Sequence, residues 1–184
     1  MIAKSSGDLY LCSEFVIDAQ DYNHFKNGSG VSSANNYAES AIRAWLNKTF
    51  YDTAFSEAEK SIIKTTHVNN SASSTGQSGN KYACGDTDDK VFLLSYSEAT
   101  SSSYGFSSVW GRRKSSTEYA RSQGTYKNGP DSNWAGDPST WNLRSPDCES
   151  GERNYYVSDE GEIYAGSVTT TTSGVVPAIH IKVS

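Results

Sequence analysis

The sequence predicts a single mixed α+β domain over residues 1–184. Three observations point to this class. Apolar residues recur at helical spacing between residues 41 and 63, strand-like segments lie near both ends of the chain, and a long polar segment separates the helices from the late strands. The length agrees with one unit, because a single core typically spans about 100–200 residues.

The N-terminal half is expected to form one strand and two helices. Residues 9–17 are apolar and β-branched enough for a strand and its exit. A helix follows, in which six residues recur at spacings of three and four and so share one face: Ala41, Ile42, Trp45, Leu46, Thr49 and Phe50. A second helix is expected to begin at Ser56, because Ser56 and Glu59 have the spacing of a capping box.

The C-terminal half is expected to supply the other strands. Residues 91–94 predict a short buried strand, and residues 100–140 form a long irregular insert. A strand at 141–145, a hairpin over 154–164 and a last strand at 178–183 follow, and the last strand should pair with the first. The predicted core centres on nine apolar residues: Ile42, Trp45, Leu46, Phe50, Ile62, Phe92, Leu94, Leu143 and Ile179.

The charge and hydropathy of the chain argue against two classes of partner. The net charge is −5, with 16 basic and 21 acidic residues, and the only basic run is the short segment 112–114. Non-specific nucleic-acid binding needs an extended basic surface, so no nucleic-acid partner is expected. No run of about 18 apolar residues occurs, and we therefore expect no membrane span.

The sequence predicts no metal centre and no cofactor. The three cysteines lie far apart and form neither a CxxC pair nor a cluster with histidine, so we expect free thiols, with one disulfide as the alternative: Cys12, Cys84 and Cys148. Asp86, Asp88 and Asp89 offer oxygen ligands for Ca²⁺. Their spacing does not match a calcium loop, and an acidic turn is the favoured interpretation.

No catalytic residues are predicted either. His24, His67 and His180 lie far apart, and no serine stands in a G-x-S-x-G nucleophile elbow.

The most informative feature is a set of ten aromatic residues between residues 104 and 164, placed among Ser, Asn, Gly, Asp and Thr. Tyr and Trp bury a large area at low entropic cost, which is typical of a recognition surface. The alternative is that the rings fill a core poor in aliphatic residues, and we expect about half of them to do so. The candidate ligand-binding residues are Trp110, Tyr126, Trp134, Asn142, Asn154, Tyr155, Tyr156 and Tyr164.

Five short segments, in order, carry a resemblance to a known family: Ser40-x-Ile42-Arg43-x-Trp45-Leu46-Asn47, Ala54-Phe55-Ser56-x-x-Glu59-Lys60, residues 89–95, Leu143-Arg144-Ser145-Pro146, and Gly174-Val175 with Pro177-Ala178. The chain resembles an uncharacterised domain family common in Gram-positive gut bacteria. That family is similar to the C-type lectin-like fold, in the branch shared with formylglycine-generating enzymes. Asn142 and Val176 depart from the family pattern, which has Trp and Arg there.

The resemblance implies a C-type lectin-like fold with a long irregular insert and a non-enzymatic recognition or display function toward a protein or glycan ligand. Many variable proteins of diversity-generating retroelements resemble this fold, which would place the chain at a cell surface, in secretions or on a phage particle. The alternatives are a formylglycine-generating-like or other secreted enzyme and a carbohydrate-binding lectin module. Cys148 has no nearby cysteine for the first, and the lectin tripeptides Glu-Pro-Asn and Trp-Asn-Asp are absent. Arg43 and Arg144 are expected to tie loops together.

Overall fold

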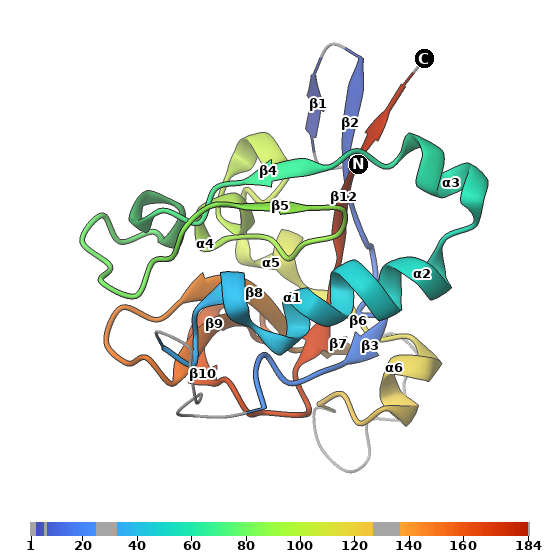
Figure 1. Cartoon of the computed structure of the whole chain (residues 1–184). Helices are drawn as coiled ribbons and strands as arrows, with labels where there is room; N and C mark the ends of the chain where they lie inside the picture. The colour runs from blue at the N-terminus through green and yellow to red at the C-terminus, as the bar shows by residue number, and fades with distance from the viewer. Residues whose placement is uncertain (1–2, 6, 25–32, 127–136, 184) are drawn as a thin grey trace.

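Strands near the two ends of the chain lie side by side in a three-stranded sheet (Figure 1). The computed structural model describes residues 3–5, 7–24, 33–126 and 137–183. In this sheet β2 (Asp8–Cys12) pairs antiparallel with both β1 (Ala3–Ser5) and β12 (Ala178–Lys182). The predicted pairing of the segment at 9–17 with the last strand is therefore confirmed.

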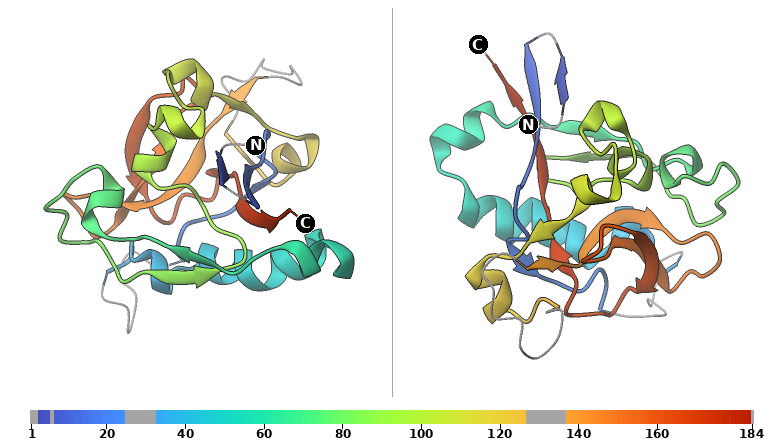
Figure 2. Two further views of the ribbon diagram at one scale, coloured as in Figure 1. Left: turned by 90° about the horizontal axis from the view of Figure 1, so that it is seen from above. Right: turned by 180° about the vertical axis from the view of Figure 1, so that it is seen from behind.

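A five-stranded sheet forms the other half of the fold and curls, as Figure 2 shows for its orange and red strands. Its order is β10 (Ile163–Ser167), β9 (Arg153–Val157), β8 (Trp141–Pro146), β11 (Gly174–Val175) and β3 (Asp18–Ala19). Only the pair of β8 and β11 is parallel. The predicted strand at 141–145 and the predicted hairpin are both confirmed.

Two small sheets and several short helices complete the described chain. The strand pairs are β4 (Thr66–Val68) with β5 (Thr87–Asp89), and β6 (Lys114–Ser115) with β7 (Pro138–Ser139). The short helices are α4 (Tyr96–Ala99), α5 (Val109–Arg112) and α6 (Glu118–Ser122), with single 3₁₀ turns at Tyr37–Glu39, Ala72–Thr75 and Ser102–Tyr104. The mixed α+β class is thus confirmed, and the described parts of the insert, residues 100–126 and 137–140, are more structured than expected.

The predicted strand at residues 91–94 is wrong. This segment is fully buried but makes only one isolated bridge, between Phe92 and Ala178. Its apolar run reflects its position in the core, because a short apolar run does not distinguish a strand from any other buried segment.

The first helix changes its winding half-way along. It begins as α1 (Ala41–Trp45), passes through a π-helical turn (Leu46–Phe50) and ends as α2 (Tyr51–Ala54). A π turn holds more residues than an α turn, so the apolar face rotates. Leu46 is buried as predicted, whereas Thr49, placed on the same face by α-helical spacing, is exposed.

The second helix is α3 (Glu57–Ile62), and its predicted capping box is present. The backbone N–H of Ser56 donates to Glu59 Oε2 at 2.8 Å, and the hydroxyl of Ser56 accepts from the backbone N–H of Glu59. No residue of this helix is buried, and Ile62 is 44% exposed, so its assignment to the core is wrong. The helix lies at the edge of the molecule in Figure 1, and its neighbour Ile63 is buried instead.

The remaining predicted core residues are all buried or pack against the core. Ile42, Leu46, Phe92, Leu94 and Leu143 are buried, while three predicted residues are only partly buried and pack against this cluster: Trp45, Phe50 and Ile179. The largest fully buried side chain is Trp141, whose indole Nε1 donates to the carbonyl oxygen of Arg112 at 3.0 Å.

A buried arginine joins three parts of the fold. Arg144, on β8, pairs with both carboxylate oxygens of Glu98 on α4. It also donates to the carbonyl oxygens of Leu93 and Asn69, at 2.7 and 3.1 Å, and to the side-chain oxygen of Asn70 at 3.2 Å. The expected tying role of Arg144 is therefore confirmed.

Arg43 makes a smaller tie of the same kind. Its Nε donates to Asp89 Oδ1 at 2.7 Å, and a second guanidinium nitrogen donates to the carbonyl oxygen of Ala38 at 2.8 Å. The carboxylate of Asp89 also accepts from the hydroxyl of Thr87. Asp89 is thereby engaged in holding the fold.

Candidate functional site

A cleft of about 400 Å³ opens over the β9–β10 hairpin and the neighbouring end of β8. Its lining is polar and contains three tyrosines, two asparagines, two carboxylates and six hydroxyl side chains from Ser and Thr. The lining residues are Tyr126, Thr140, Asn142, Asn154, Tyr156, Ser158, Asp159, Glu160, Tyr164, Gly166, Ser167, Thr170, Thr172 and Ser173.

The strand register explains why these residues gather on one face. Alternate residues of a strand point to the same side, so Asn154 and Tyr156 on β9 share a face. On β10, Tyr164 lies opposite Tyr156 and Gly166 lies opposite Asn154. On β8, Asn142 lies opposite Tyr156. Residues from three adjacent strands are therefore brought to one site.

Two buried asparagines form the floor of the cleft. Asn142 and Asn154 are each 2% exposed, and Asn154 Nδ2 donates to Asn142 Oδ1 at 3.0 Å. The same amide contacts the carbonyl oxygens of Leu143 and Tyr155, and Asn142 Nδ2 donates to the carbonyl oxygen of Gln20 at 3.3 Å. The Oδ1 atom of Asn154 accepts no hydrogen bond from the described residues, which leaves an acceptor at the floor.

Tyrosine rings form the walls. The rings of Tyr156 and Tyr164 lie 6.2 Å apart at an angle of 45°. A β-carbon at Gly166 would lie 2.9 Å from the ring of Tyr156, so the absence of a side chain there makes room for this ring. Burial raises the pKa of Tyr156, and the neighbouring Tyr164, Asp159 and Tyr126 raise it further.

The turn between β9 and β10 carries the two carboxylates and is held by α5. Arg112 Nε donates to the carbonyl oxygen of Gly161 at 2.7 Å, and Arg113 Nε donates to that of Asp159 at 3.0 Å. Gly161 has a φ of +86°, and a β-carbon there would lie 1.9 Å from the carbonyl oxygen of Val109. Glycine is needed at this position for both reasons.

Five of the eight predicted binding residues meet in the cleft: Tyr126, Asn142, Asn154, Tyr156 and Tyr164. Trp110 is 71% exposed but does not line it, and the guanidinium of Arg113 lies over its ring at 4.8 Å. Trp134 lies outside the described residues.

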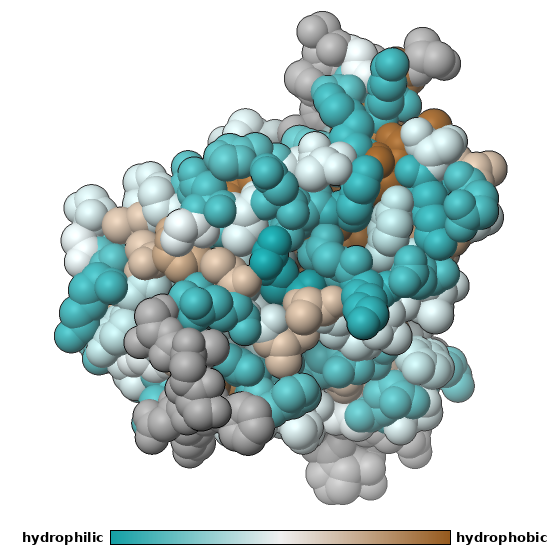
Figure 3. Space-filling model, in the orientation of Figure 1, coloured by the Kyte–Doolittle hydropathy of each residue, from teal (hydrophilic) through white to brown (hydrophobic). Residues whose placement is uncertain are grey.

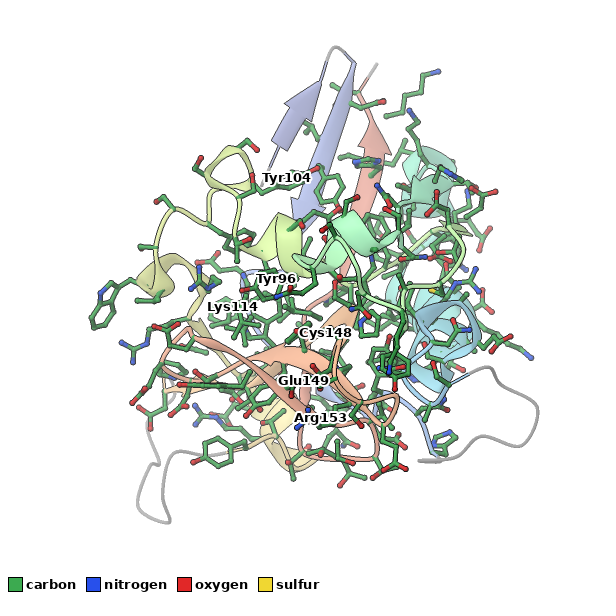
Figure 4. All side chains as sticks on the ribbon, turned by 90° about the vertical axis from the view of Figure 1, so that its left-hand side faces the viewer. Tyr96, Tyr104, Lys114, Cys148, Glu149 and Arg153 are labelled. Carbon is green, nitrogen blue, oxygen red and sulfur yellow. The ribbon has the colours of Figure 1, made fainter. Side chains whose placement is uncertain are left out.

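Tyr155 lies on the opposite face of β9, so the structure does not bring it into the cleft with Tyr156. Its ring packs 5.2 Å from that of Tyr96, and its hydroxyl donates to Cys148 Sγ at 3.7 Å. Figure 4 shows Tyr96 and Cys148 near the middle of the molecule, with Arg153 and Glu149 below them.

Sequence reasoning missed the carboxylates and the hydroxyls that complete the cleft. Asp159 and Glu160 read as an ordinary hairpin turn, and residues 169–172 read as a low-complexity loop. The hairpin prediction itself carried a usable signal, since the alternation of Asn154, Tyr156 and Ser158 defines one face. Nothing in the sequence places the loop at 169–172 against that face.

The described residues contain no metal-binding cluster. No group of three or more His, Cys, Asp or Glu side chains is placed to hold a metal ion there. His67 lies between Asp86 and Asp88, with its ring nitrogens 3.4 and 3.0 Å from their carboxylates. All three cysteines are free, as their spacing suggested, and each of them is half-buried. None of the described helices is long and apolar enough to cross a membrane.

Comparison with known families gives one match. The model of a domain of unknown function, DUF6273, matches residues 6–183. The chain belongs to the DUF6273 family. No curated protein and no solved structure matches it. Both the buried core and the cleft lie within the part of the chain that defines the DUF6273 domain.

Proposed function

We propose that the chain is a non-enzymatic recognition domain whose ligand binds in the cleft over the β9–β10 hairpin. One observation carries this proposal: five residues chosen for their recognition chemistry converge there from separate parts of the sequence. The volume of about 400 Å³ lies within the range of about 300–1,000 Å³ found for ligand pockets.

The composition of the cleft supports binding of a partner with both flat and polar features. Tyr126 and Tyr164 are exposed at the rim, and Tyr156 is half-buried between the rim and the asparagine floor. Binding energy at recognition surfaces concentrates in a few aromatic anchors surrounded by polar groups. The short hydroxyl side chains around these anchors supply adaptable hydrogen bonding.

The proposal includes a C-type lectin-like fold and the origin of the cleft as a variable surface. The antiparallel pairing of β2 with β12 and the late strands that follow the helices support the fold. Asn154, Tyr155, Tyr156, Ser158 and Tyr164 are residue types expected from adenine-directed mutagenesis, and all of them except Tyr155 line the cleft. Changes at the half-buried Tyr156 and the exposed Tyr164 would alter ligand contacts while leaving the buried core in place. A template repeat and a reverse transcriptase gene beside the coding sequence would establish this origin.

A blocking substitution tests the site without removing any of its present contacts. Thr170 is exposed and lines the cleft, so Thr170→Trp is expected to fill the space and abolish binding to whichever glycan-array or peptide-array features the unmodified chain binds. Thr49→Trp, on the exposed side of the π-helical turn, is the matched control and should leave binding unchanged. Equal binding by both variants would show that recognition occurs elsewhere.

A further inference from the structure

Among the described residues, the cleft carries negative charge without a positive counterpart. Asp159 and Glu160 line it, and none of its described lining residues is Lys, Arg or His. Within the part of the chain that the structure describes, neither carboxylate takes part in an ion pair. Arg113 reaches this turn from α5, but its Nε contacts the backbone oxygen of Asp159 and its guanidinium lies over Trp110.

Aromatic faces adjoin these carboxylates. Tyr126, Tyr156 and Tyr164 all line the cleft, and the rings of the last two form a tilted pair, 6.2 Å apart at an angle of 45°. The negative face of an aromatic ring attracts a cation placed over it. Burial raises the pKa of Tyr156, and the nearby Tyr164, Asp159 and Tyr126 raise it further, so the carboxylate of Asp159 lies within electrostatic range of this phenol.

The floor independently calls for a hydrogen-bond donor. The side chain of Asn154 is almost fully buried, and its Nδ2 is engaged by Asn142 Oδ1 and two carbonyl oxygens. Its Oδ1 atom accepts no hydrogen bond from the described residues. This atom is not sealed from solvent, and an ammonium or guanidinium group in the cleft would offer it donors and no acceptors.

We propose that the ligand presents an organic cation, an alkylammonium or guanidinium group, to this cleft. This rests on the cleft being the recognition site. The group would lie against the tyrosine faces, donate to Asn154 Oδ1 and neutralise Asp159 and Glu160. A neutral sugar would match the hydroxyl side chains but would leave both carboxylates uncompensated, so the observations favour the cation.

The test is a calorimetric or NMR titration of the full chain with charged probes and a neutral isostere. Choline, N-acetyl-lysine amide and N-acetyl-arginine amide carry the cation, and 3,3-dimethylbutanol has the shape of choline without its charge. We expect choline to bind at least about tenfold more tightly than the isostere, and its affinity to fall as NaCl is raised. Tighter binding of the two amino-acid amides, whose N–H groups can donate to Asn154 Oδ1, would identify a peptide side chain as the source. Tighter binding of choline, which has no N–H, would identify a small quaternary ammonium compound held by the tyrosine faces and the carboxylates.

Charge-neutral variants locate the effect. Asp159→Asn combined with Glu160→Gln is expected to weaken cation binding by about tenfold or more with an unchanged melting temperature. Glu14→Gln combined with Glu118→Gln removes the same charge from exposed positions outside the cleft and should change affinity by less than about twofold.

Two results would overturn the inference: no binding of any cationic probe, or equal affinity for choline and its isostere. If methyl glycosides bind instead and Thr170→Trp abolishes that binding, the recognition function stands and only the ligand class is wrong. If Thr170→Trp changes no array feature, the recognition function at this cleft fails as well.

Discussion

Replacing Arg144 with methionine is expected to lower the free energy of unfolding by about 3–5 kcal/mol. The substitution would leave the carboxylate of Glu98 without its bidentate partner and would release the carbonyl oxygens of Leu93 and Asn69. Buried charges and acceptors left unpaired carry a large desolvation cost. Urea unfolding followed by circular dichroism measures the effect, and Lys48→Met, which removes a positive charge from an exposed position, should stay within about 0.5 kcal/mol.

The ion pair between Arg144 and Glu98 should also make the free energy of unfolding depend on pH under acidic conditions. Burial raises the pKa of Glu98, but Arg144 and hydrogen bonds from Ser95 outweigh this, so its pKa in the folded protein lies below the usual value. A group with a depressed folded pKa stabilises the fold above its unfolded pKa of about 4.3, and this contribution is lost as pH falls through the folded pKa. Arg144→Met should remove this stabilisation. If the variant kept the urea midpoint and the acidic pH dependence of the unmodified chain, the pair of Arg144 and Glu98 would not stabilise the fold.

The second large effect is expected for Trp141→Ala, at about 3–5 kcal/mol, because removing a fully buried aromatic leaves a cavity. Trp141→Phe should cost less, about 1–3 kcal/mol, since it keeps an aromatic ring but leaves the carbonyl oxygen of Arg112 without its donor. The same unfolding experiment measures both. A phenylalanine variant as unstable as the alanine variant would mean that the hydrogen bond to Arg112 outweighs the packing of the ring.

Local patterns in the sequence were sufficient for the elements whose stability is itself local. The capping box at Ser56 and Glu59 forms as its spacing predicts, and the β9–β10 hairpin closes across a short turn. The π-helical turn was not predictable, because nothing in Leu46–Phe50 distinguishes it from an α-helical turn. The exposure of Ile62 depends on where α3 packs, which is a tertiary property that residue type does not report.

At the candidate site, too, local sequence patterns were informative and long-range contacts were not predictable. Composition singled out Tyr126, Tyr156 and Tyr164, since tyrosines among short polar residues favour recognition. Composition alone did not separate Tyr155 from Tyr156, although strand alternation places them on opposite faces. The two carboxylates and the loop at 169–172 join the cleft through chain reversal and long-range packing, and these contacts leave no periodic signal in the sequence.

We expect ligand binding to depend on the cleft tyrosines, and the free energy of unfolding to depend on the buried core and on Arg144. The double variant Tyr156→Ala with Tyr164→Ala tests this expectation most directly, with array binding and thermal unfolding measured on one preparation. We expect binding to disappear and the melting temperature to fall by no more than a few degrees, because the two rings pack mainly against each other and over Gly166. Retained binding, or collapse of the fold, would contradict it.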